Sequence, residues 1–255
     1  MTWLDLLALL GAGGFAGLIN TVVGSGTLIT FPTLLALGVP PVIANVSNTV
    51  GLAPGSVSGA WATRRELGGQ RRRVLWLGSA SLLGGIAGAV LLLWLPSEAF
   101  DAIVPVLIGL GCVLVILQPV ISKRLAIRRA RLGLDADHVH GPVLLWLGVA
   151  VTGIYGGYFG AAQGVLLIAI LGIGFAESLP RINAIKNVLA TIVNGIAAVV
   201  FVIVSQVNWP AAIAIAVGSV LGAQVGGRVG RKLPPMVYRV IIVAVGIAAI
   251  VSLSS

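Results

Sequence analysis

Apolar residues fill long uninterrupted stretches of this chain, and charged residues are confined to short segments between them. Stretches such as 74–95 and 184–206 can cross a bilayer as helices, which takes about 20 residues. The strict alternation of a membrane β-barrel strand is not seen. The pattern predicts an all-α, polytopic membrane protein whose ten apolar segments cover residues 3–22, 26–38, 42–62, 74–95, 102–122, 142–159, 163–176, 184–206, 210–227 and 236–253.

The composition agrees with a membrane location. Of the 255 residues, 58% are hydrophobic and 9% are charged, whereas soluble domains carry about a quarter charged residues. The N-terminus lacks the positive region of a signal peptide and carries Asp5 instead, so we expect it to be retained as the first span. The expected location is the cytoplasmic (inner) membrane, with several passes.

The positive charge is concentrated beside the apolar segments. The net charge is +9, and thirteen of the sixteen Lys and Arg residues fall within 64–73, 123–131 and 228–232. Such clusters mark cytoplasmic loops, and this distribution argues against nucleic acid as a partner. We therefore expect the loops 64–73, 123–140 and 228–235 to be cytoplasmic, with both termini outside the cytoplasm.

Two apolar segments, 26–38 and 163–176, are too short to cross a bilayer as straight helices. Each follows a break rich in small residues, Gly24-Ser25-Gly26 in one case and Gly160-Ala161-Ala162 in the other. The three cytoplasmic loops keep a consistent orientation only if each short segment completes a crossing together with its neighbour. We therefore predict two matched, broken membrane segments.

The matched breaks predict an internal repeat. The basic linker 123–141 separates a first transmembrane repeat, 1–122, from a second, 142–255, and each contains five apolar segments in the order long, short, long, long, long. An odd number of segments makes the second repeat inverted in the membrane, as in many secondary transporters. In the pairing of motifs, Gly24 matches Gly160 and Ser47 matches Lys186.

The breaks form the first candidate site. A helix interrupted inside the bilayer leaves backbone groups that protein, water or a ligand must satisfy. The half-helix after each break points its positive end at that region, which suits an anion. The alternative is that the small residues only let helices pack closely. The predicted substrate-binding residues here are Asn20, Gly24, Ser25, Gly26, Thr27, Gly160, Gln163 and Gly164.

Polar residues within apolar helices form the second candidate site, because such residues are costly in a membrane and face a cavity or a partner. Lys186 either faces the anion or extends to the lipid headgroups from near the end of its helix. We interpret Glu177 and Arg181 as ordinary loop charges. The predicted substrate-binding residues in this group are Asn45, Ser47, Asn48, Thr49, Asn183, Lys186, Asn187 and Asn194.

The sequence carries no sign of catalysis. HExxH, GxSxG and Walker motifs are absent, and the only carboxylates near the predicted spans, such as Asp5 and Glu177, lie at their edges. Cys112 is the single cysteine, and the His138–His140 region reads as a solvated loop. The glycines at every fourth position from 218 to 230 predict close helix packing. We therefore expect no enzyme, cofactor or metal site.

Two passages of the sequence resemble one family. "LGVPPVIANVSNTVGLAPGSVSGA" and its counterpart "IYGGYFGAAQGVLLIAILGIGFAESLPRINAIKNVLATIVNGIAA" resemble the TauE/SafE (TSUP) membrane permeases, or sulfite exporters, over nearly the whole chain. The resemblance implies transport of a small sulfur-containing anion such as sulfite, thiosulfate or a sulfonate. The implied partners are this anion and the lipid bilayer, with assembly into a homo-oligomer left open.

Three functions remain to be weighed. A secondary transporter with alternating access agrees best with paired breaks, hydroxyl and amide donors, a lysine and no repelling carboxylate. A channel for small anions is the first alternative. A membrane-embedded enzyme is the weaker one, because no nucleophile and base are paired within the spans.

Overall fold

The computed structural model describes residues 1–132, 142–175, 177–229 and 235–254. These ranges form ten α-helices and one short 3-10 helix, without a β-strand. The elements are α1 (Trp3–Val22), α2 (Thr27–Ala36), α3 (Pro41–Ala62), η1 (Arg64–Leu67), α4 (Arg71–Trp94), α5 (Ser97–Leu132), α6 (Pro142–Tyr158), α7 (Gln163–Gly174), α8 (Leu179–Val204), α9 (Trp209–Val229) and α10 (Pro235–Ser254).

Each predicted apolar segment corresponds to one helix, so the all-α prediction is confirmed. The expected loop 123–140 needs a correction, because α5 continues through Lys123 to Leu132. This basic stretch is rich in Arg, Ala and Leu, which favour helix, so the helix does not stop where the apolar run stops. The rest of that loop, including His138 and His140, and positions 230–234 lie outside the described residues.

The helices pack around an apolar core that includes some buried polar side chains, and they also expose many large apolar side chains. Five helices are long and apolar enough to cross a membrane, namely α1, α4, most of α5, α8 and most of α9. The apolar helical stretches Thr27–Ala36, Val143–Tyr158, Gln163–Gly174 and Arg239–Val251 are shorter. Large exposed apolar side chains include Trp3, Leu83, Trp94, Val106, Val151, Ile203 and Leu221. The molecule is a multi-pass membrane protein whose outer surface suits lipid.

Glycines allow two helix pairs, α1 with α9 and α4 with α6, to approach closely. A Cβ atom on Gly222 would lie 1.8 Å from the carbonyl oxygen of Gly14. A Cβ atom on Gly84 would lie 2.2 Å from the carbonyl oxygen of Ala150. Only glycine permits such contact between backbones, and the packing role predicted for the glycine series is confirmed.

Helices α1, α3 and α9 run in the same direction. Gly13 of α1 lies against Ile215 of α9. One turn later Gly17 lies against Ser219, so residue numbers rise together along the pair. Helix α3 approaches the same two residues of α9 in the same order.

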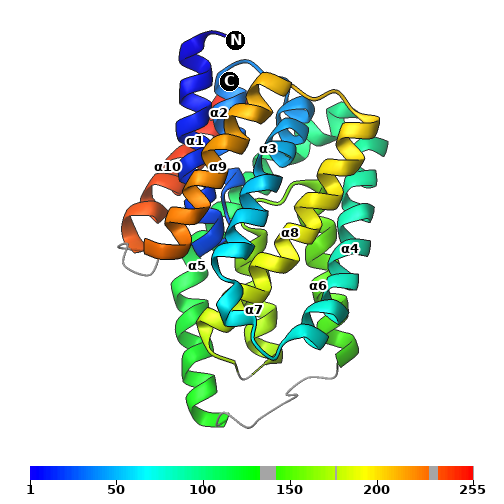
Figure 1. The fold of residues 1–255 in the computed structure, drawn as a ribbon. Coiled ribbons are helices and arrows are strands. Elements are labelled where there is room, and N and C mark those ends of the chain that lie inside the picture. The colour runs from blue at the N-terminus through cyan, green and yellow to red at the C-terminus, as the bar shows by residue number, and fades with distance from the viewer. Residues whose placement is uncertain (133–141, 176, 230–234, 255) are drawn as a thin grey trace.

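Helices α4, α6 and α8 run the opposite way. The hydroxyl of Thr191 in α8 donates to the Ser56 carbonyl at 2.9 Å, and the Asn187 amide donates to Thr63 Oγ1 at 3.1 Å. Along these two contacts the residue numbers rise on α3 and fall on α8, so the two helices are antiparallel. The order of glycine contacts makes α4 parallel to both α6 and α8. The start of α1 and the end of α10 lie at the same end of the bundle (Figure 1).

Candidate functional site

The two breaks have the same backbone geometry. Gly24 ends α1 with φ of +88°, and its N–H donates to the Ile19 carbonyl at 3.1 Å. Gly160 ends α6 with φ of +77°, and its N–H donates to the Tyr155 carbonyl at 3.0 Å. Left-handed backbone of this kind favours glycine, which explains why both breaks carry one.

The structure brings these two breaks into direct contact. The N–H of Gly164 donates to the Gly24 carbonyl at 3.0 Å. A Cβ atom on Gly24 would lie 2.3 Å from Gly164 Cα, so the two backbones touch without intervening side chains. The breaks of the two halves, more than a hundred residues apart in sequence, therefore form one junction.

Lys186 lies at this junction. Its side chain is 0% exposed, and its ammonium donates to the carbonyls of Asn20 at 2.9 Å and Thr21 at 3.3 Å. A Cβ atom on Gly164 would lie 2.9 Å from Lys186 Cδ. Burial among protein atoms excludes the headgroup interpretation of this lysine. The ammonium instead faces the last turn of α1, where free carbonyls carry partial negative charge.

Other side chains of α8 bind the same helix end. Asn183 Nδ2 donates to the Thr21 carbonyl at 3.1 Å, and Asn187 Nδ2 does so at 3.4 Å. At the second break, Asn45 of α3 donates to the Tyr158 carbonyl at 2.8 Å. In each case, a side chain from the third helix of one half therefore satisfies a carbonyl at the end of the first helix of the other half.

A second polar group lies where α1, α3 and α8 meet. Ser56 Oγ accepts hydrogen bonds from Asn194 Nδ2 at 2.8 Å and Asn20 Nδ2 at 3.4 Å. Thr191 donates to the Ser56 carbonyl. The predicted residues Asn20 and Asn194 thus come together, but Ser56 and Thr191 were missed. Both are polar residues within apolar helices, which is the same sequence signal that selected Asn48.

Three consecutive predicted residues of α3 point to different neighbours. Ser47 Oγ accepts from the Asn208 N–H at 2.8 Å, at the start of α9. Asn48 accepts a hydrogen bond from Thr30 and donates to Thr27 Oγ1 at 3.4 Å, so it faces α2. Thr49 is also buried. Since neighbouring helix positions are about 100° apart, these residues do not share one face, and Ser47 has its hydrogen bond away from Lys186.

Several buried polar atoms near the breaks have no hydrogen-bond partner within the protein. They are Ser25 Oγ, Asn45 Oδ1, Gln163 Nε2 and Asn183 Oδ1. Gln163 packs on Gly156, where a Cβ atom would lie 2.3 Å from its Cδ. Gly26 packs against α1, where a Cβ atom would lie 2.7 Å from the Ala16 carbonyl oxygen. Ser25, Gln163 and Asn183 thus offer free donors or acceptors, whereas Gly26 has a packing role.

A cavity of about 800 Å³ adjoins the first break. Its walls come from both halves of the chain, and its lining includes Thr21 and Asn183, which contact each other. Three arginines and one glutamate contribute the charge: Arg64, Arg65, Arg228 and Glu66. The Arg64 guanidinium lies 4.1 Å from the centroid of the Trp61 ring, which also lines the cavity. The cavity is therefore basic and ends one hydrogen bond from Lys186.

The second break is covered by aromatic rings instead. Phe31 of α2 meets Phe159 edge to face, with ring centroids 5.1 Å apart. Phe100 of α5 lies 5.7 Å from Tyr158 and 6.2 Å from Phe159 between ring centroids. These four residues, the aromatic cluster, are all buried. The α6–α7 break thus has an apolar cover where the α1–α2 break has a polar cavity.

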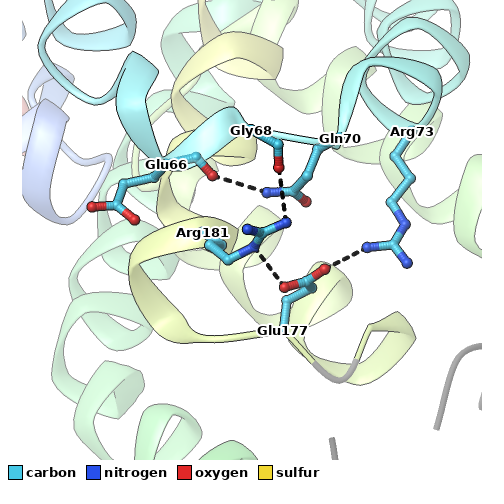
Figure 2. A network of polar contacts seen from close by, with 6 residues as sticks. All are labelled: Glu66, Gly68, Gln70, Arg73, Glu177 and Arg181. Carbon is cyan, nitrogen blue, oxygen red and sulfur yellow. Dashed lines mark hydrogen bonds and ion pairs between the residues drawn. The ribbon is translucent and has the colours of Figure 1, made fainter. Parts of the chain in front are cut away.

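Glu177 and Arg181 differ from the loop charges we expected. Glu177 binds Arg73 at the start of α4 at 2.6 Å and Arg181 in the first turn of α8 at 2.7 Å. Arg181 also donates to the Gly68 carbonyl at 3.0 Å, and the Gln70 amide donates to the Glu66 carbonyl at 3.1 Å (Figure 2). This network joins the η1–α4 turn of the first half to the α7–α8 connection of the second.

Comparisons with known proteins find similarity to membrane transporters. A probable membrane transporter protein of Haemophilus influenzae is 28% identical over 231 residues, covering 88% of this chain and 85% of that protein. The probable membrane transporter protein YfcA of Escherichia coli K12 is 26% identical over 235 residues, covering 86% and 79%. A probable membrane transporter protein, ORF9, of a Sinorhizobium species is 28% identical over 259 residues, covering 97% and 92%.

No solved structure matches the chain. The family model described as sulfite exporter TauE/SafE matches residues 9–253, almost the full length. The match includes both breaks, Lys186 and the helices that line the cavity. The chain therefore belongs to the sulfite exporter TauE/SafE family of membrane transporters.

Proposed function

We propose that the chain is a secondary transporter that moves a small sulfur-containing anion, such as sulfite, thiosulfate or an organosulfonate, across the cytoplasmic membrane. The observation that carries the proposal is the basic cavity that ends at Thr21 and Asn183, next to the buried Lys186. Arginine and amide donors with a buried ammonium suit an oxyanion, which accepts several hydrogen bonds.

Transport in this proposal proceeds by alternating access between two inverted repeats, residues 1–122 and 142–255, joined by the cytoplasmic linker 123–141. The opposite directions of α1 and α6, of α3 and α8, and of α4 and α9 support the inversion. The equivalent glycine contacts, Gly84 on Ala150 and Gly222 on Gly14, support a shared ancestry of the halves. Binding sites of such transporters lie at the interface between the repeats.

The basic cavity is then the cytoplasmic entrance, since Arg64, Arg65 and Arg228 line it and basic residues favour the cytoplasmic side. The aromatic cluster closes the opposite route. The anion moves from the cavity to the junction of the two breaks, where Asn183 and Lys186 bind it. Ser25 and Gln163, each with an unpartnered polar atom, complete its coordination as the cavity closes.

Binding and transport assays test the proposal. Purified protein is heated with sulfite, thiosulfate, sulfoacetate, sulfate or chloride, and the sulfur anions are expected to raise the melting temperature above that with chloride. Bound ligand at a hundred times its Kd adds about 2.7 kcal/mol of stability. Thiosulfate uptake into proteoliposomes should saturate and show counterflow. Unitary conductance would identify a channel, and the absence of both stabilisation and counterflow for the whole panel would reject the function.

A further inference from the structure

Lys186 is unusual in its burial and in its partners. Among the side chains that the structure describes, it is the only charged one classed as buried. Its ammonium donates hydrogen bonds to the backbone carbonyls of Asn20 and Thr21, which are neutral groups. A buried charge is costly unless an opposite charge compensates it.

Within the part of the chain that the structure describes, no opposite charge contacts Lys186. Helix α1 contributes the two carbonyls, and α7 contributes Gly164. Asn183 and Asn187 of its own helix share the Thr21 carbonyl and do not titrate. The charged groups that line the adjoining cavity are Arg64, Arg65, Arg228 and Glu66, which together are positive. Glu177 is engaged by Arg73 and Arg181.

We propose that Lys186 carries a proton together with the transported anion. This inference rests on the proposed function and adds its coupling ion. The amine takes up a proton from water when the anion binds beside it, which forms a compensated ion pair. When the anion leaves on the other side of the membrane, the amine returns the proton to water there. One proton therefore moves with each anion: an O–H bond of hydronium breaks as the N–H bond forms on one side, and the reverse occurs on the other.

The hydrogen bonds of Lys186 also connect its proton to the α1–α2 break. The ammonium holds the last turn of α1, and this turn leads directly into Gly24 and its contact with Gly164. Charged donors form stronger hydrogen bonds than neutral ones, so loss of the proton weakens the hold on the first break. Anion, proton and the position of the α1–α2 break are thus linked, and each affects the others reciprocally.

The test uses the full chain in proteoliposomes that contain a pH-sensitive dye. Thiosulfate is the substrate because it stays a dianion near neutral pH and does not carry protons itself. Uptake of radiolabelled thiosulfate should acidify the lumen by one proton per anion. The apparent affinity should weaken as pH rises, by at most tenfold per pH unit for a single linked proton.

Two substitutions assign the proton to Lys186. Lys186→Arg keeps a charge that is not released, so anion exchange across the membrane is retained while net uptake and its pH dependence are lost. Lys186→Gln should abolish the proton movement. The matched control is Lys123→Gln, which removes an exposed lysine of α5 and should leave both fluxes unchanged. Size-exclusion chromatography establishes that each variant is folded.

The outcomes separate this inference from the proposed function. Wild-type thiosulfate uptake without acidification overturns proton coupling and leaves the transporter intact, and this measurement decides even where neither Lys186 variant folds. Proton movement that persists in Lys186→Gln overturns the assignment to this residue. Absence of counterflow for thiosulfate and every other anion of the panel overturns both.

Discussion

The α1–α2 and α6–α7 breaks share one backbone design and differ in what surrounds it. Each ends a helix with a left-handed glycine that bonds to a carbonyl five residues earlier. The first break adjoins a basic cavity, and Lys186 and two asparagines bind its helix end. The second is held by Asn45 and covered by the aromatic cluster. The two breaks thus share their backbone geometry and differ in their side-chain surroundings.

This difference lies in the side chains around the two breaks. The first break adjoins a cavity with charged and polar groups, whereas the second packs against buried aromatic rings. Substitutions of the two glycines should therefore act alike, and substitutions of the side chains around them should have unequal consequences.

The largest effect is expected at the contact between the breaks. Gly24→Leu should abolish transport, a loss of at least about a hundredfold, because a Cβ atom there would lie 2.3 Å from Gly164 Cα on a left-handed backbone. Gly160→Leu should act in the same way, with φ of +77°. Thiosulfate counterflow measures the effect. Gly11→Leu, at a position with no atom within 4 Å of an added Cβ, is the control. Normal transport in Gly24→Leu would show that the breaks do not need to touch.

The next effect should fall on the aromatic cluster. Phe159→Ala should destabilise the protein by about 3 kcal/mol, since it removes a large buried side chain that meets Phe31 and Phe100. The melting temperature in detergent measures the loss, and Val151→Ala, at an exposed position of the preceding helix α6, serves as comparison. A lowered melting temperature with unchanged anion affinity would separate the cover from the binding site. Equal melting temperatures for the two variants would contradict the packing role.

A smaller and more specific effect is expected at the polar break. Asn183→Ala leaves Thr21 with one amide donor fewer and removes a cavity-lining polar group. We expect thiosulfate affinity to fall about tenfold, or about 1.4 kcal/mol, with little change in melting temperature. Ser47→Ala is the matched control, because Ser47 binds the start of α9 instead. If both variants bind thiosulfate equally well, the anion does not bind at the first break.

The smallest effect should come from the network of Figure 2. Glu177→Gln weakens ion pairs with Arg73 and Arg181 that remain partly exposed, and such pairs contribute about 1 kcal/mol or less. The expected result is a slightly lower melting temperature that high salt renders equal to that of the wild type. Glu98→Gln, at an exposed position of α5, should show no change. A large destabilisation would mean that this network supports the fold more than its exposure suggests.

Much of the architecture could be predicted from the sequence, because only a few kinds of structure can cross a bilayer. Apolar runs gave the ten helices, and the glycines at 24 and 160 gave the positions of both breaks. The end of α5 could not be placed in this way, since a helix that leaves the membrane continues on its own propensity. Hydropathy locates the membrane-spanning part of a helix but does not show where the helix ends once it has entered water.

The candidate site was predictable in its types of residue and less so in its contacts. Lys186 was singled out by its charge, but its partners are backbone carbonyls, which any residue provides. Ser47 and Asn48 were chosen together, although one helix step directs them to different neighbours. Arg73 and Glu177 are 104 positions apart in the sequence and form an ion pair. Periodicity within one helix cannot predict a contact between residues so far apart in sequence.

The hydrogen bond between Gly164 and Gly24 has a consequence for the choice of positions to vary. This one contact between the breaks is made of main chain alone, although Lys186 and Asn183 bind beside it. A substitution of a neighbouring side chain can therefore change the polar groups around the contact and leave its own hydrogen bond in place. The residues that can be varied to alter binding are thus separate from the backbone that holds the two breaks together.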